Sequence, residues 1–175
     1  MNETVAQRRI VVGVDGSASS RAALRWAVRQ AALVGAAVEA VITWEYPAVY
    51  QWGVPVADVD DGVVAGYAGK TLAEAVAEET GPQYPVEVRE RVEYGNAAQV
   101  LLEVAEGAEL LVLGNRGHGG FVGALLGSVS QHCVQHASCP VVVVRDTEHT
   151  EHTEQAERTE QAERTEPADG TPAGR

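Results

Sequence analysis

The chain is poor in several residue types, and their scarcity narrows its fold and function. Only two of its 175 residues are cysteines, Cys133 and Cys139, so a disulfide framework is excluded. The chain has no run of 18 apolar residues and no secretory signal at its start, so we expect neither a membrane span nor secretion. Because 45% of the residues are apolar, one well-packed core can form. We therefore expect a cytoplasmic protein with a single core.

Positive charge is also scarce. The 13 Lys and Arg residues stand against 25 Asp and Glu residues, a formal net charge of −12, and Lys70 is the only lysine. From Asp146 onward nine acids face three arginines, a net of −6, and the preceding residues carry sixteen acids and ten bases, also −6. An acidic chain without a basic stripe is poorly suited to bind nucleic acid or an anionic membrane.

The last thirty residues differ from the rest in composition. They repeat the segment TEQAER and contain no valine, leucine, isoleucine or aromatic residue, so they can bury almost no apolar surface. We predict one domain over residues 1–145, followed by an acidic, repetitive and disordered tail over residues 146–175. Metal binding by His149 and His152 is disfavoured, because an unstructured tract has no preformed coordination geometry.

Apolar and amphipathic segments alternate along the first 145 residues. Short apolar or alternating runs predict strands, and apolar residues at helical spacing predict helices, with Asn96 capping the third helix. The region 45–66, which includes Asp58, Asp60 and Asp61, is expected to be an irregular connection with solvated turns. The predicted strands are 10–14, 38–44, 86–94, 110–113 and 141–144, and the predicted helices are 19–34, 68–79, 96–106 and 128–137.

This alternation predicts an α/β fold with a parallel sheet, right-handed crossovers and helices on both faces. The first and fourth strands are continuously apolar and should be central, whereas the third alternates with charged residues and should be an edge. The order 3-2-1-4-5 satisfies both conditions and gives a five-stranded, Rossmann-like sheet. Ligands of such sheets bind beyond the carboxyl ends of the strands, at the switch point between the first and fourth strands.

The stretch 110–130, LLVLGNRGHGGFVGALLGSVS, joins a strand to a helix through a glycine-rich loop. Glycines let backbone N–H groups approach an anion, and a helix N-terminus adds unpaired N–H donors. The loop therefore predicts a phosphate site. It is not a Walker A loop, because Gly127 rather than lysine precedes Ser128. The segment Gly13-Val14-Asp15-Gly16-Ser17 does not fit the dinucleotide-binding fingerprint either.

Gly114-x-x-Gly117, followed by nine residues and then Gly127-Ser128, resembles the nucleotide-binding signature of the universal stress protein family, in its ATP-binding branch. The resemblance covers residues 8–145 and includes the opening IVVGVDGS and the closing CPVVVV. The chain resembles single-domain bacterial members of the family. The resemblance implies an adenine nucleotide alpha hydrolase-like fold, bound ATP with or without Mg²⁺, and an unknown protein partner. It also implies a homodimer through the last strand, which comprises Val141, Val142, Val143 and Val144.

The switch point and the resemblance together define a candidate site. Asp15 is expected to contact the ribose or adenine, with an Asx turn as its structural alternative. Ser128 and Ser130 are expected to contact phosphate, although either could instead cap the helix. The resemblance adds the backbone of Val129 and places Thr43 beside the adenine. The candidate ATP-binding residues are Gly13, Asp15, Thr43, Gly114, Gly117, Gly127, Ser128, Val129 and Ser130.

Two residues inside the loop stay unassigned. Arg116 and His118 could balance phosphate charge, or each could be an ordinary solvated residue. No catalytic residue is predicted, because hydrolysis needs an oriented water and only His118 could serve as a base in the loop. The favoured function is that of an ATP-binding regulatory protein, and the resemblance implies that it acts in the stress response. The alternatives are a slow ATPase and a module that binds AMP or a cyclic nucleotide.

A metal site near the C-terminal end of the domain is disfavoured. His132 and His136 share a helix face, but no Glu follows His132 to act as a metalloprotease base. Cys133 points elsewhere on the helix, and Cys139 lies beyond its end. We interpret these four side chains as buried packing residues.

Overall fold

The computed structural model describes residues 8–46, 60–81, 84–117 and 125–146. The chain divides into two units, Met1–Arg145 and Asp146–Arg175, and the fold below is that of the first. Residues 147–175, with His149 and His152, lie outside the described residues, so the disorder of the tail stays a prediction. The elements are β1 (Arg9–Gly13), α1 (Ala18–Val34), β2 (Ala37–Trp44), α2 (Asp61–Glu79), β3 (Val88–Tyr94), α3 (Ala97–Val104), β4 (Leu110–Gly114), α4 (Ser128–His136) and β5 (Val141–Val144).

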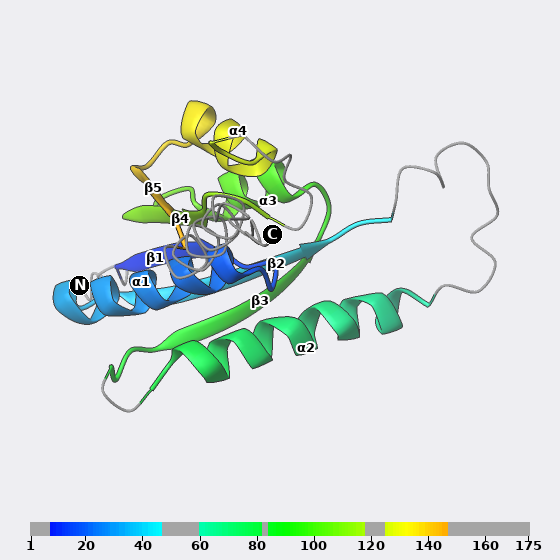
Figure 1. The fold of residues 1–175 in the computed structure, drawn as a ribbon, viewed down its shortest axis with the longest axis horizontal. Coiled ribbons are helices and arrows are strands. Elements are labelled where there is room, and N and C mark those ends of the chain that lie inside the picture. The colour runs from blue at the N-terminus through cyan, green and yellow to red at the C-terminus, as the bar shows by residue number, and fades with distance from the viewer. Residues whose placement is uncertain (1–7, 47–59, 82–83, 118–124, 147–175) are drawn as a thin grey trace, which may run out of the picture. The chain divides into compact units, whose positions relative to one another are not determined.

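The five strands form one sheet in the order β3-β2-β1-β4-β5, and every neighbouring pair is parallel. The predicted fold class and strand order are confirmed. Helices α1 and α2 cover one face of the sheet, and α3 and α4 cover the other (Figure 1). Since β1 pairs with both β2 and β4, the switch point of the sheet lies between β1 and β4.

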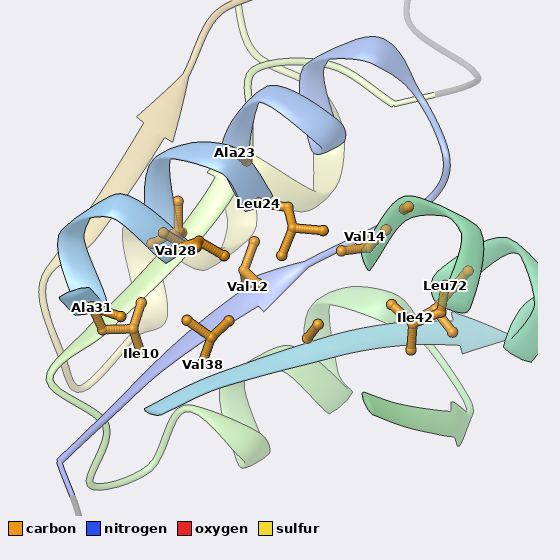
Figure 2. Close-up of a cluster of buried hydrophobic side chains, with 14 of the residues drawn as sticks. Ile10, Val12, Val14, Ala23, Leu24, Val28, Ala31, Val38, Ile42 and Leu72 are labelled. Carbon is orange, nitrogen blue, oxygen red and sulfur yellow. The ribbon is translucent and has the colours of Figure 1, made fainter. Parts of the chain in front are cut away.

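Each face of the sheet has its own hydrophobic cluster. Figure 2 shows the first, in which Val12 of β1 packs with Leu24 of α1 and Leu72 of α2. The second cluster takes Val11 of β1 and side chains from α3 and α4, including Leu101. Alternate residues in the middle of β1 thus face opposite clusters, and Ile10, Val11 and Val12 are all buried. This explains why the strand is a continuous apolar run rather than an alternating one.

The start of α2 differs from the prediction. The helix begins at Asp61 rather than at residue 68, and the side chain of Asp60 caps it by accepting a 2.8 Å hydrogen bond from the N–H of Gly62. The prediction was wrong because three glycines in the first turns are typical of loops and lower helix propensity. Leu72 and Ala75 are buried on the inner side of α2, and this packing stabilises the helix despite the glycines.

The other predicted boundaries agree to within one or two residues. Asn96 caps α3 as predicted, because its Oδ1 accepts hydrogen bonds from Ala98 N at 3.1 Å and Gln99 N at 3.3 Å. The strand predicted to be an edge, β3, is one, and β5 is the other. Among the described residues, none of the helices combines the length and apolarity that a membrane crossing requires.

Candidate functional site

A cavity of about 440 Å³ opens beyond the carboxyl ends of β1 and β4. All nine candidate residues line it, although they come from β1, β2, β4, α4 and the segments that follow the strands. The cavity therefore lies at the switch point, as strand order alone predicts. Its volume falls in the range of small-molecule pockets, which is about 300–1,000 Å³.

The cavity has an apolar wall that sequence reasoning missed. Val41 of β2 lies two residues before Thr43 and so on the same side of the strand, whereas Ala97 and Leu101 project from α3. The sequence shows that Val41 and Thr43 share one side of a strand and that Ala97 and Leu101 share one side of a helix. It does not show that α3 packs over β2 and brings these two sides together. The further lining residues are Val14, Ser20, Leu113, Arg116 and Leu126.

Three side-chain and backbone groups hold the segment that runs from Gly114 to Gly117. The Oγ of Ser130 donates a 2.7 Å hydrogen bond to the carbonyl of Gly114. The N–H of Gly127 donates to the carbonyl of Asn115 at 2.8 Å, and Ser19 Oγ donates to the carbonyl of Arg116. Three successive carbonyls are thus occupied by other parts of the protein. The cavity-lining backbone is therefore held in one place by α1 and α4.

This arrangement qualifies the expectation for Ser130. Its side chain is buried, with 5% of its surface exposed, and its single hydroxyl proton is donated to Gly114. Ser130 lines the cavity, but its hydroxyl joins α4 to the end of β4. Ser128, in contrast, is exposed at the start of α4 and also lines the cavity.

Helix α4 begins without a side-chain cap. Side-chain oxygens of Ser17, Asp60 and Asn96 cap α1, α2 and α3, whereas α4 has Gly127 at this position and no side-chain hydrogen bond. The first bond of α4 runs from Gln131 N to Gly127 O, at 2.9 Å. The preceding N–H groups, those of residues 128–130, have no partner within the helix. Neither serine caps α4, so three N–H groups without a partner in the helix and the positive end of the helix dipole meet the cavity.

Two glycines of the site are required by close contacts. A Cβ atom at Gly114 would lie 2.7 Å from Ser19 Oγ and 2.8 Å from its backbone carbon. A Cβ atom at Gly117 would lie 2.5 Å from Asp15 Oδ2. At Gly127, the nearest described atom would be the Cα of Arg116 at 3.6 Å, an ordinary contact. Packing in the described part of the chain therefore explains Gly114 and Gly117 but does not explain Gly127.

Asp15 forms the Asx turn that was its structural alternative, and it also lines the cavity. Its Oδ1 accepts hydrogen bonds from the N–H and the Oγ of Ser17, at 3.0 and 2.6 Å, which is an Asx turn at the start of α1. Its Oδ2 is the oxygen beside Gly117, and the residue lines the cavity. The turn orients the carboxylate toward the segment that follows β4.

The histidines and cysteines near α4 form no metal-ligand cluster. Among the described residues, no group of three or more His, Cys, Asp and Glu side chains could hold a metal. Cys133 is buried against α3, and burial raises the pKa of its thiol to about 11. His132 and His136 were expected to be buried, which is wrong: they are exposed and stack with ring centroids 4.2 Å apart. Only the Cys133 face of α4 meets α3, so the histidine face is left to solvent.

The sequence from residue 7 to residue 145 matches the model of the universal stress protein family. The chain belongs to the universal stress protein family. It is 35% identical over 156 residues to universal stress protein Rv2005c of Mycobacterium tuberculosis, covering 85% of this chain and 51% of that protein. It is 31% identical over 159 residues to a universal stress protein of Mycolicibacterium smegmatis, covering 87% of this chain and 53% of that protein. The chain thus spans about half the length of both relatives.

A solved structure gives a further comparison within the universal stress protein family. It is described as the crystal structure of a universal stress protein in complex with cAMP. It matches this chain with a TM-score of 0.60 and 27% sequence identity, over 79% of this chain and 97% of that one. The fold of this chain is thus that of known universal stress proteins.

Proposed function

We propose that this protein is a regulatory protein that binds ATP in the cavity at the switch point. One observation carries the proposal: the uncapped start of α4 and the anchored Gly114–Gly117 segment meet in a cavity that also contains Asp15. Free N–H donors and a helix dipole stabilise phosphate, and a carboxylate accepts hydrogen bonds from ribose hydroxyls. The cAMP complex of the 27%-identical universal stress protein supports an adenine nucleotide as the ligand class.

The two ends of the nucleotide would bind in different parts of the cavity. Val41 and Leu101 form an apolar surface suited to the adenine, with Thr43 beside it as a hydrogen-bonding side chain. The phosphates would lie at Gly127, Ser128 and Val129, where the first N–H groups of α4 have no partner within the helix. Asp15 follows β1, which lies between β2 and β4 in the sheet, and would bind the ribose.

Any Mg²⁺ would be held mainly by the phosphates. Asp15 is the only carboxylate among the described residues that line the cavity, and its Oδ1 already accepts two hydrogen bonds from Ser17. Mg²⁺ keeps several waters and commonly uses one or two carboxylates together with phosphate oxygens. The ion would neutralise phosphate charge, while the residues of the chain position the nucleotide.

Regulation would follow from the difference between the occupied and the empty site. A protein partner that binds the nucleotide-loaded form more tightly would read the nucleotide state of the cell. Such a role requires tight binding and slow turnover. Among the described residues that line the cavity, there is no histidine or lysine to act as a general base, and His118 lies outside the described residues. Slow hydrolysis of ATP is the alternative that an activity assay would test.

Binding of AMP or a cyclic nucleotide is the second candidate function, favoured by the cAMP-bound relative. The same cavity would serve, and the adenosine contacts would not change. The two candidates differ in the number of phosphates that the start of α4 receives. They are therefore separated by the order of affinities for ATP, AMP and cAMP.

We also propose that two copies of the chain associate through β5. This strand is the last in the sheet, and its four valines are half-buried in the single chain. An apolar edge strand with free backbone groups pairs readily with another strand. A two-fold axis beside β5 would join the two sheets symmetrically.

Calorimetric titration of ATP, AMP and cAMP, with Mg²⁺, tests the ligand. The variant Gly127→Val should lose at least about tenfold in ATP affinity, since its methyl groups would extend beyond a Cβ that already contacts the backbone of Arg116 at 3.6 Å and would displace this side of the proposed phosphate site. Gly66→Val is the matched control, because Gly66 is exposed on α2 with no atom within 4 Å of its Cβ position. Failure of the parent protein to bind any adenine nucleotide would refute the proposal.

A further inference from the structure

Arg116 is the only cationic side chain among the described residues that line the cavity, and Asp15 is the only anionic one. The two charges balance, so the described lining has no net charge. ATP carries close to four negative charges at neutral pH, and AMP carries about two. The two nucleotides share the same adenosine and differ only in their number of phosphates. A single cation placed at the phosphate end would therefore contribute to ATP binding more than to the binding of adenosine.

The backbone of Arg116 is held beside the first residues of α4. The Cα of Arg116 lies 3.6 Å from the Cβ position of Gly127, the N-cap residue of that helix. Its carbonyl accepts a hydrogen bond from Ser19 Oγ, and Ser19 is buried, with 8% of its surface exposed. The preceding residue is fixed as well, since the backbone N–H of Asn115 donates to Val144 and its carbonyl accepts from Gly127. The side chain of Arg116 thus starts from a defined point next to the first N–H groups of α4, which have no partner within the helix.

The guanidinium of Arg116 has no charged or hydrogen-bonding partner among the described residues. Six other arginines of this acidic chain form ion pairs with glutamates: Arg8, Arg9, Arg21, Arg25, Arg89 and Arg91. Over the ranges 8–46, 60–81, 84–117 and 125–146, the side chain of Arg116 makes no ion pair or hydrogen bond. It is exposed and lines the cavity. A planar guanidinium with five donors fits phosphate oxygens in a bidentate arrangement.

We infer that Arg116 determines how strongly the site prefers nucleotides with more phosphates, by binding the phosphate groups beyond the first. The inference rests on the proposed function and deepens it. The N–H groups of α4 bind whichever phosphate lies closest to the helix, and Arg116 adds a charge beside them. Its contribution grows with phosphate number, so Arg116 sets the ratio of ATP affinity to adenosine affinity.

The test is a calorimetric series with adenosine, AMP, ADP and ATP at fixed Mg²⁺, in the parent protein and in Arg116→Gln. In the parent, affinity should rise along the series. The substitution should lower ATP affinity about tenfold, the size expected for one solvent-exposed charge-assisted contact, and change adenosine affinity less than about twofold. Arg116→Lys should recover part of the loss, because a point charge remains while the bidentate geometry is lost.

Arg29→Gln is the matched control for the loss of one positive charge. Arg29 is exposed on α1, nine residues beyond Ser20 and thus roughly 13 Å along the helix from the cavity. It should leave all four affinities unchanged. Equal losses of adenosine and ATP affinity in Arg116→Gln, no loss of ATP affinity, or the same loss in Arg29→Gln would each overturn the inference. A parent protein that binds neither adenosine nor ATP would instead refute the proposed function itself.

Discussion

The carboxylate of Asp15 lies against the backbone of Gly117, so closely that a Cβ atom at residue 117 would be 2.5 Å from Asp15 Oδ2. The two residues are 102 positions apart and come from segments that follow neighbouring strands β1 and β4. The Asx turn with Ser17 fixes the other carboxylate oxygen. The side chain therefore cannot move away from residue 117 without losing a turn at the start of α1.

Gly117→Ala should for this reason destabilise the protein even without nucleotide. We expect a loss of about 1–3 kcal/mol in the free energy of unfolding, the usual cost of forcing an extra methyl group into a packed position. Urea denaturation measures it. In the Asp15→Ala background the same substitution should cost much less, since the clashing oxygen is gone. Equal costs in both backgrounds would show that the contact with Asp15 is not the cause.

Ser130→Ala and Ser128→Ala should separate stability from binding. Loss of the Ser130 hydroxyl leaves the carbonyl of Gly114 without its 2.7 Å hydrogen bond and should lower the free energy of unfolding by about 1–3 kcal/mol. Ser128 makes no capping bond and is exposed, so its replacement should change stability by less than about 0.5 kcal/mol. ATP affinity should fall in Ser128→Ala. Urea denaturation measures the stability of both variants, and calorimetry measures their ATP affinity. Equal losses of stability in the two variants would contradict the prediction.

The buried thiol of Cys133 should make stability depend on alkaline pH. Its pKa is raised from 9.0 to about 11, so the folded state keeps the proton that the unfolded state releases above pH 9. The unfolded state then binds fewer protons, and stability should fall as the pH rises from 9 to 11. Urea denaturation at pH 7, 9 and 10.5 measures the fall. Cys133→Ala should show a smaller fall, and an unchanged one would mean that other groups cause it.

The same pKa predicts slow chemistry at this thiol. Thiolate is the reactive form, so at pH 8 the folded protein should alkylate at Cys133 far more slowly than in 8 M urea. In Cys139→Ser, which leaves Cys133 as the only thiol, mass spectrometry after iodoacetamide treatment would follow the reaction. Similar rates in the two conditions would show that the thiol is not protected in the fold.

Val143→Lys should abolish the proposed dimer. A charged side chain on an edge strand opposes pairing with another strand, and Val143 lies in the middle of β5, opposite Leu113 of β4. Sedimentation analysis should then find monomers. Val92→Lys puts the same change on β3, the opposite edge, and should leave association intact. Circular dichroism would check that both variants fold, and a dimer that survives Val143→Lys would place the interface elsewhere.

Much of the fold could be predicted because its signals are local. Continuous apolar runs in β1 and β4 indicate strands buried on both faces, and the alternation in β3 indicates an edge. The start of α2 could not be predicted, because contacts of Leu72 and Ala75 with the sheet outweigh the glycines in its first turns. The exposure of His132 and His136 could not be predicted either. Helical spacing identifies a shared face but not which face meets α3.

At the candidate site, the kinds of chemistry that are possible could be predicted from the sequence. The glycine spacing, the missing lysine before Ser128 and the acid after β1 are properties of short segments, and they predict a phosphate-binding loop without a Walker lysine. Which groups the rest of the fold already uses, and which it leaves facing the cavity, depends on the tertiary contacts. Ser19 meets Arg116, and Ser130 meets Gly114, across 97 and 16 residues of chain. Such contacts depend on how the strands and helices cross in space, and they leave the start of α4 and the side chain of Arg116 facing the cavity.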